Sequence, residues 1–179
     1  MIIGVTGTSG AGKDTVADYL VKKGYTYFSC SNILRGEAKK LGLNYDRDTL
    51  IKLGNKLRAQ HGADYLARKC LEKIHEAGIK NAVVVSIRNS AEVKAFKEEG
   101  NFILICVDAP IEIRYKRIKK RNRSEDKVSL KKFKEQEEKE LRGSETHQQL
   151  QKVMNMADFR VINDGSIKEL YKKIDEITS

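Results

Sequence analysis

Proline, tryptophan and cysteine are scarce in this chain, which has one proline and no tryptophan in 179 residues. A single proline argues against a long, extended linker. Cys30, Cys70 and Cys106 are far apart, odd in number and without a C-x-x-C pair. That pattern argues against a disulfide framework or a cysteine metal site, and predicts reduced thiols in the core of a cytoplasmic protein. The three histidines are equally scattered, so no histidine metal site is expected.

Long hydrophobic runs are also missing. No apolar stretch approaches the ~20 residues of a membrane span, and the opening segment MIIGVTG lacks the basic and apolar regions of a signal peptide. Hydrophobic residues make up 40% and charged residues 34% of the chain, as in globular domains. We therefore expect one domain over residues 1–179, located in the cytoplasm and without a membrane partner.

Positive charge is in excess, with a formal net charge of +10. Such a charge favours anionic ligands in general, from nucleic acids to small polyphosphates. Aromatic residues are only 7% of the chain and are scattered, so they provide no stacking platform for single-stranded nucleic acid. A nucleic-acid partner is therefore not expected, and the oligomeric state is left open.

Short apolar runs predict strands at residues 2–6, 25–30, 82–87, 102–107 and 159–162. Helices are expected between them: from 13 to about 24, three within 32–78, at 91–99 with Ser90 as cap, from 110 into a basic run, two within 130–156, and at 166–177. Alternating strands and helices indicate an α/β fold. Its five-stranded parallel sheet is expected to have helices on both faces, giving three layers.

A phosphate-binding loop stands between the first strand and the first helix. Gly7, Gly12 and Lys13 match the pattern G-x-x-x-x-G-K, with Gly10 and Ala11 inside the loop. Glycines let successive backbone amides curve around an anion, and the helix N-terminus adds partial positive charge. Lys13 is expected to reach the β- and γ-phosphates of ATP. The sequence therefore predicts a P-loop NTPase fold.

The residue after Lys13 departs from the usual pattern. Asp14 stands where a serine or threonine normally binds Mg²⁺, and Thr15 follows. Asp14 and Thr15 are the candidate metal ligands, directly or through water. Asp14 as a favourable carboxylate in the first helical turn remains an equal alternative.

Five segments together resemble one family, in the expected order over nearly the whole chain. They are GKDT in the loop, SNILRGEAKKLGL at 31–43, SIRNSAEVKAF at 86–96, DAPIEIRYKRIKKRNRSED at 108–126 and INDGS at 162–166. The set resembles P-loop nucleoside and deoxynucleoside monophosphate kinases and dephospho-CoA-kinase-like proteins. The resemblance implies a core of residues 1–30, 79–113 and 157–179, a helical acceptor-binding insertion at 31–78, and an Arg-rich lid with its following helices at 114–156.

The same resemblance assigns roles to single residues. Arg35, one turn into its helix, and Arg88, after the third strand, take the acceptor phosphate, as bidentate guanidinium groups suit phosphate. The lid arginines Arg117, Arg121 and Arg123 stabilise phosphoryl charge when the lid closes. Asn163 and Gly165 border the adenine of ATP.

The acceptor determines the expected chemistry. No carboxylate is present at Ser29–Asn32, where hydroxyl-phosphorylating relatives carry an aspartate, and Ser86 stands where relatives often have a metal-binding aspartate. We therefore predict an ATP- and Mg²⁺-dependent kinase acting on a phosphate of a nucleotide-like small molecule. A dephospho-CoA-kinase-like enzyme with Asp14 as base, and an ATP-binding regulatory module without transferase activity, are the alternatives. The sequence does not decide between ATP and GTP.

Overall fold

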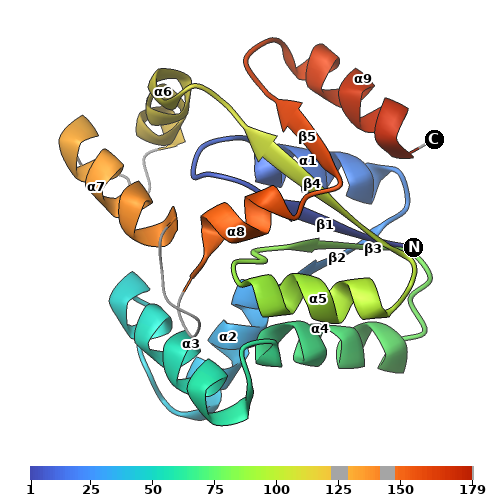
Figure 1. Cartoon of the computed structure of the whole chain (residues 1–179), viewed down its shortest axis with the longest axis vertical. Helices are drawn as coiled ribbons and strands as arrows, with labels where there is room; N and C mark the ends of the chain where they lie inside the picture. The colour runs from blue at the N-terminus through green and yellow to red at the C-terminus, as the bar shows by residue number, and fades with distance from the viewer. Residues whose placement is uncertain (122–128, 142–147, 179) are drawn as a thin grey trace.

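The computed structural model describes residues 1–121, 129–141 and 148–178. Its centre is a five-stranded sheet in which every pairing is parallel. The strand order is β2-β3-β1-β4-β5 (Figure 1). The strands are β1 (Ile2–Thr6), β2 (Thr26–Ser29), β3 (Ala82–Val85), β4 (Phe102–Asp108) and β5 (Phe159–Ile162).

Helices cover both faces of the sheet, so the predicted three-layer α/β fold is confirmed (Figure 1). The described helices are α1 (Lys13–Lys22), α2 (Cys30–Lys40), α3 (Arg47–His61), α4 (Tyr65–Glu76), α5 (Ser90–Glu98), α6 (Ile111–Arg121), α7 (Leu130–Leu141), α8 (Leu150–Asn155) and α9 (Ile167–Thr178). None of the described helices is long and apolar enough to cross a membrane.

Side-chain alternation along the buried strands builds two cores. In β1, Ile3 and Val5 face α1 and α9, whereas Ile2 faces the other layer. That second layer includes α2, α4, α5 and α8, with Phe96 fully buried against the sheet. The central strands are buried on both faces, which explains why their sequences read as continuous apolar runs.

All three cysteines lie in the core as free thiols. Burial raises the pKa of Cys106 to about 11. A hydrogen bond with Cys70, together with burial, raises the pKa of Cys30 well above its usual value. The three cysteines are therefore buried free thiols, as the sequence predicts.

Several element boundaries differ by one or two residues from the sequence prediction; β3, for example, ends at Val85 and not at Ile87. Cys30 begins α2 and does not end β2. The cap of α5 is Asn89, one residue before the predicted Ser90. Asn89 accepts a hydrogen bond from the Ala91 amide at 2.9 Å, while Glu92 returns to the Asn89 amide at 3.1 Å. This capping box satisfies free amides at the helix start.

Within that second layer α2 and α4 pack near β2 and β3, and α3 packs on α2 and α4 (Figure 1). Ala38, Leu50, Leu53 and Leu57 form a separate small core between α2 and α3. These helices stand on one side of the carboxyl ends of the strands, opposite α6. A pocket lies between them, at the sheet edge where ligands gather in parallel α/β folds.

Candidate active site

The segment from Gly7 to Gly12 wraps tightly between β1 and α1. Gly7, Gly10 and Gly12 all have positive φ, at 137°, 78° and 107°. A Cβ on Gly10 would lie 2.7 Å from the Arg114 carbonyl oxygen, and one on Gly7 would collide with the backbone of Val107. Only glycine fits these positions, and the resulting curve brings backbone amides toward one point, as an anion cradle requires.

Lys13 lies half-buried at the start of α1. Its ammonium donates to the Thr8 carbonyl oxygen at 2.7 Å, so the side chain folds back over the loop. Burial, and next the charge of Arg88, lower the pKa of Lys13 to about 8, against an opposing effect of Asp14. A desolvated ammonium beside other cations is a strong site for a polyphosphate, because a bound anion offsets both the desolvation of the ammonium and its repulsion by the neighbouring cations.

Asn163, predicted to border the adenine of ATP, forms a hydrogen bond with the phosphate loop. It is buried, and its Nδ2 donates to the Ala11 carbonyl oxygen at 2.8 Å. Arg117 approaches both the Ala11 carbonyl oxygen and Asn163 Oδ1 at 3.5 Å. Asn163 therefore ties the turn after β5 to the phosphate loop.

Asp108 and Arg114 also fix the loop, and the sequence did not reveal these roles. Thr8 Oγ1 donates to Asp108 Oδ1 at 2.7 Å. Arg114 is buried, donates to the carbonyl oxygens of Ala109 at 2.7 Å and Ser9 at 3.3 Å, and pairs with Glu137 of α7. In the sequence, Arg114 is not distinguished from the other basic residues that follow it. Its contacts brace the loop and attach α7 to α6.

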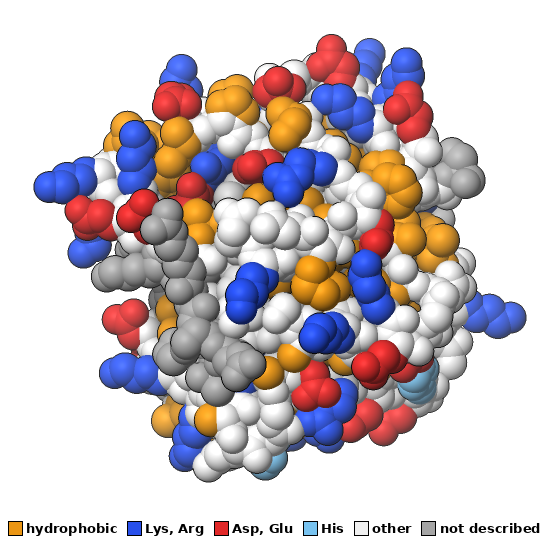
Figure 2. Space-filling model, viewed as in Figure 1, with side chains coloured by type: hydrophobic (Ala, Val, Ile, Leu, Met, Phe, Trp, Pro, Cys, Tyr) orange, Lys and Arg blue, Asp and Glu red, His pale blue; other side chains and the backbone are white. Residues whose placement is uncertain are grey.

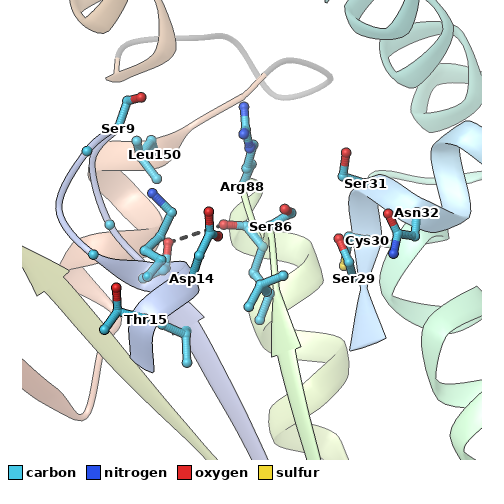
Figure 3. Close-up of a pocket in the computed structure, with 18 of the residues that line it drawn as sticks. Ser9, Asp14, Thr15, Ser29, Cys30, Ser31, Asn32, Ser86, Arg88 and Leu150 are labelled. Atoms are coloured by element: carbon cyan, nitrogen blue, oxygen red, sulfur yellow. Dashed lines mark hydrogen bonds between the residues drawn. The ribbon is translucent and has the colours of Figure 1, made fainter. Parts of the chain in front are cut away.

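Asp14 and Thr15 lie at the start of α1. Figure 3 shows the Asp14 carboxylate directed across the pocket toward Ser86, at the end of β3. Ser86 has φ 64°, a left-handed conformation that non-glycine residues rarely adopt. The Asp14 carboxylate and the hydroxyls of Thr15 and Ser86 thus line the pocket that contains the phosphate loop. Oxygen donors of this kind are the ligands that Mg²⁺ takes.

Arg35, on α2, and Arg88, on the loop after β3, also line the pocket. Figure 3 shows Arg88 extending from the loop after β3 into the space between the phosphate loop and the start of α2, where Ser31 and Asn32 lie. Arg35 is exposed and donates to Ser31 Oγ at 3.0 Å and Asn32 Oδ1 at 3.3 Å. Arg88 donates to Gln148 Oε1 at 3.0 Å.

A buried ion pair stands behind Arg88 and was also missed from the sequence. Arg58 of α3 donates to Glu92 Oε1 through Nη2 at 2.9 Å and Nε at 3.2 Å. Glu92 Oε2 accepts the backbone amides of Arg88 at 2.8 Å and Asn89 at 3.1 Å. The only local signal was a glutamate three residues after Asn89, in the capping-box spacing.

One pocket of about 1440 Å³ brings the predicted residues together. Its walls include Gly7, Gly10, Gly12, Lys13, Asp14, Thr15, Arg35, Arg88, Arg117, Arg121, Asn163 and Gly165. Ala11 is buried inside the loop. Arg123, a predicted lid arginine, falls outside the described residues.

Comparison with known structures defines the class of protein. A family model described as an AAA domain matches residues 3–143. The structure of TT1252 from Thermus thermophilus is similar with a TM-score of 0.64 at 20% identity, covering 99% of this chain and 96% of that one. Shikimate kinase from Bacteroides thetaiotaomicron gives a TM-score of 0.60 at 13% identity, with 99% and 98% covered. The fold is that of the P-loop kinases.

Sequence relatives identify the family. The UPF0200 protein of Thermococcus onnurineus is 31% identical over 182 residues, covering 99% of this chain and 96% of that protein. The UPF0200/UPF0201 protein of Archaeoglobus fulgidus is 34% identical over 180 residues, and this chain spans only 54% of its length. The chain therefore belongs to the UPF0200 family, a P-loop kinase-like family.

Proposed function

We propose that this protein is an ATP-dependent kinase that transfers the γ-phosphoryl group to the phosphate of a nucleoside monophosphate or deoxynucleoside monophosphate. The observation that carries the proposal is the pairing of two cationic sites in one pocket. The phosphate loop carries Lys13, and two further cations, Arg35 from α2 and Arg88 from the loop after β3, line the same pocket. A protein that only binds ATP has no need of the second site.

The proposed step needs little covalent chemistry from the protein. An oxygen of the acceptor phosphate bonds to the γ-phosphorus, the bond from that phosphorus to the β–γ bridging oxygen breaks, and ADP leaves with the electron pair. The acceptor phosphate is already anionic, so no base has to remove a proton. Lys13, Arg117, Arg121 and Arg123 are the groups proposed to stabilise charge on the transferred phosphoryl.

Asp14 and Thr15 are the residues proposed to hold Mg²⁺, and their oxygens suit that ion. When bound, Mg²⁺ would neutralise part of the charge on the ATP phosphates. A cytoplasmic location accompanies the proposal. The three buried free thiols favour a reducing compartment.

The face drawn in Figure 2 supports a small-molecule acceptor. Lysine and arginine side chains on that face are interspersed with aspartate and glutamate, and no continuous basic stripe crosses the part of it that the structure describes. A duplex or single strand of nucleic acid favours such a stripe.

The test is ADP formation by the purified protein with MgATP and a panel of acceptors. Stimulation by one or more nucleoside monophosphates, with a nucleoside diphosphate as product, is the expected result. If ATP binds but no acceptor stimulates turnover, the protein is an ATP-binding regulatory module and the proposal fails.

A hydroxyl acceptor, as in dephospho-CoA kinases, is the second candidate. The position of Asp14 favours it, because this carboxylate faces the pocket between the donor loop and the opposite wall (Figure 3). There it could take the hydroxyl proton as the phosphorus–oxygen bond forms. Phosphorus NMR of the product separates the two, since a hydroxyl acceptor yields a phosphomonoester and a phosphate acceptor yields a diphosphate.

A further inference from the structure

Arg58 has one nitrogen that the Glu92 ion pair does not use. Nε and Nη2 both donate to Glu92 Oε1. Among the residues that the structure describes, Nη1 has no hydrogen-bond partner. The Arg58 side chain is only 6% exposed and lines the pocket. No fully buried side-chain nitrogen or oxygen in the described chain lacks a partner, so Nη1 reaches the open space of the pocket.

Gly54 leaves room beside that nitrogen. It lies one turn before Arg58 in the interior of α3, where glycine is among the least favourable residues. A Cβ at this position would lie 3.3 Å from Arg58 Nη1 and 3.4 Å from Leu34 Cδ2. The glycine therefore keeps open a space that is bordered by a hydrogen-bond donor and an apolar side chain.

The surroundings of Arg58 indicate what fills this space. Leu34, Leu50 and Leu66, from α2, α3 and α4, line the pocket together with Arg58. The charge of Arg58 is already balanced by Glu92, so a further anion gains little there. A flat heterocycle with apolar faces and a polar edge matches such walls, provided that its edge offers an oxygen to accept from Nη1.

We infer that Arg58 determines specificity by donating a hydrogen bond from Nη1 to a carbonyl oxygen on the base of the acceptor nucleotide. The inference rests on the proposed function, because it assumes that the acceptor phosphate lies at Arg35 and Arg88. Glu92 is a positioning residue: one carboxylate oxygen orients Arg58 and the other holds the Arg88 backbone. The pair thereby fixes the base contact relative to the loop that carries Arg88.

The probe pair is inosine 5′-monophosphate and purine riboside 5′-monophosphate, which differ at the C6 carbonyl group. Binding to the full chain is measured by calorimetry, without turnover. Uridine 5′-monophosphate and adenosine 5′-monophosphate extend the comparison. We expect at least one carbonyl-bearing nucleotide to bind about tenfold or more tightly than its partner, as for a hydrogen bond to a charged donor.

Three variants test the cause. Gly54→Ala adds one methyl group beside Nη1 and leaves every charge in place. The double variant R58M/E92Q removes the ion pair as a unit, so no buried charge is left unpaired. Both should reduce the preference for the carbonyl-bearing nucleotide to about twofold or less. Arg35→Met, the matched control at the phosphate, should weaken both nucleotides equally and keep the preference.

Equal binding within both nucleotide comparisons by the unaltered protein would overturn the inference, as would an unchanged preference in both Gly54→Ala and R58M/E92Q. Binding of dephospho-CoA alone, in an Arg58-dependent manner, would also overturn the assignment to a base. The kinase proposal is tested separately. Carbonyl-selective binding without phosphoryl transfer supports this inference and refutes the kinase, whereas transfer without carbonyl selectivity does the reverse.

Discussion

At the scale of single residues, Lys13 combines two properties that ordinarily oppose each other. It carries the positive charge of the donor loop, yet burial and Arg88 make that charge costly in the free protein. The Thr8 carbonyl oxygen, at 2.7 Å, offsets part of this cost. Phosphate oxygens can replace that carbonyl and add full negative charges, so ligand binding should restore the ammonium to a favourable state.

Lys13→Ala should abolish turnover while the fold remains. Loss of a preorganised charge contact lowers kcat by about 100-fold or more. The thermal unfolding midpoint should not fall, since the variant removes a desolvated charge. Lys22→Ala, at the exposed end of the same helix, is the control and should behave like the unaltered protein. Retained activity in Lys13→Ala would remove the loop from the mechanism.

ATP affinity should depend on pH through Lys13. In the free protein the pKa of Lys13 is about 8, and bound phosphates raise it. Below pH 8 the lysine is charged in both states, so affinity does not change with its titration. Above pH 8 the free protein loses the proton and must regain it on binding, so affinity falls by up to about tenfold per pH unit.

Calorimetry at pH 8.5 in two buffers with different ionisation enthalpies measures this proton directly. Net uptake on ATP binding is the expected sign, and Lys13→Ala should lose it. Zero uptake, or release, would contradict the depressed pKa.

At the scale of elements, α6 carries basic residues with two different roles. Arg117 and Arg121 line the pocket. Arg114, on the same helix, is buried between the phosphate loop and α7, where it meets Glu137 and lies 5.8 Å from the centre of the Phe133 ring. A movement of α6 is therefore coupled to the phosphate loop through Arg114.

Arg114→Met should destabilise the protein and weaken ATP binding together. It leaves Glu137 without its partner and the Ser9 and Ala109 carbonyl oxygens without their donor, a loss of about 3 kcal/mol. For a chain of this size that lowers the unfolding midpoint by roughly 10 °C. Lys116→Met, exposed on the same helix, should change the midpoint little. A stable Arg114→Met protein with normal ATP affinity would show that the brace is dispensable.

At the scale of the whole molecule, the pocket joins two parts of the chain that pack separately. The sheet core carries the phosphate loop, and α2 with α3 has its own small core. A ligand that reaches both sides should stabilise the molecule more than one that fills a single side.

A bisubstrate analogue, with two nucleosides joined by a polyphosphate chain, provides that comparison. At 100 times its dissociation constant any one-site ligand adds about 2.7 kcal/mol of stability. At equal concentration the analogue should raise the unfolding midpoint by clearly more than ATP does. Arg35→Ala should remove this additional increase and leave the increase that ATP produces unchanged. If the analogue and ATP give the same midpoint, the two cationic sites do not act on one ligand.

The sequence predicted the sheet well, because strands buried on both faces need continuous apolar runs such as AVVV at Ala82–Val85. It predicted the phosphate loop because glycine spacing and Lys13 are local features. The pairing of Arg58 with Glu92 was not predicted, because the two residues are 34 residues apart and only the tertiary fold brings their side chains together. The role of Arg114 was not predicted for a similar reason: it begins a segment rich in lysine and arginine, and its partner Glu137 lies on another helix.

The burial of Cys30, Cys70 and Cys106 makes the chain convenient for fluorescence work. Thiol dyes react with exposed thiolates, whereas these three side chains are at most 1% exposed, and the pKa values of Cys30 and Cys106 are raised. A dye should therefore attach only to cysteines introduced on the surface. A donor–acceptor pair placed on α3 and α6 would report whether the two walls approach each other as nucleotides bind, with the native thiols left in place.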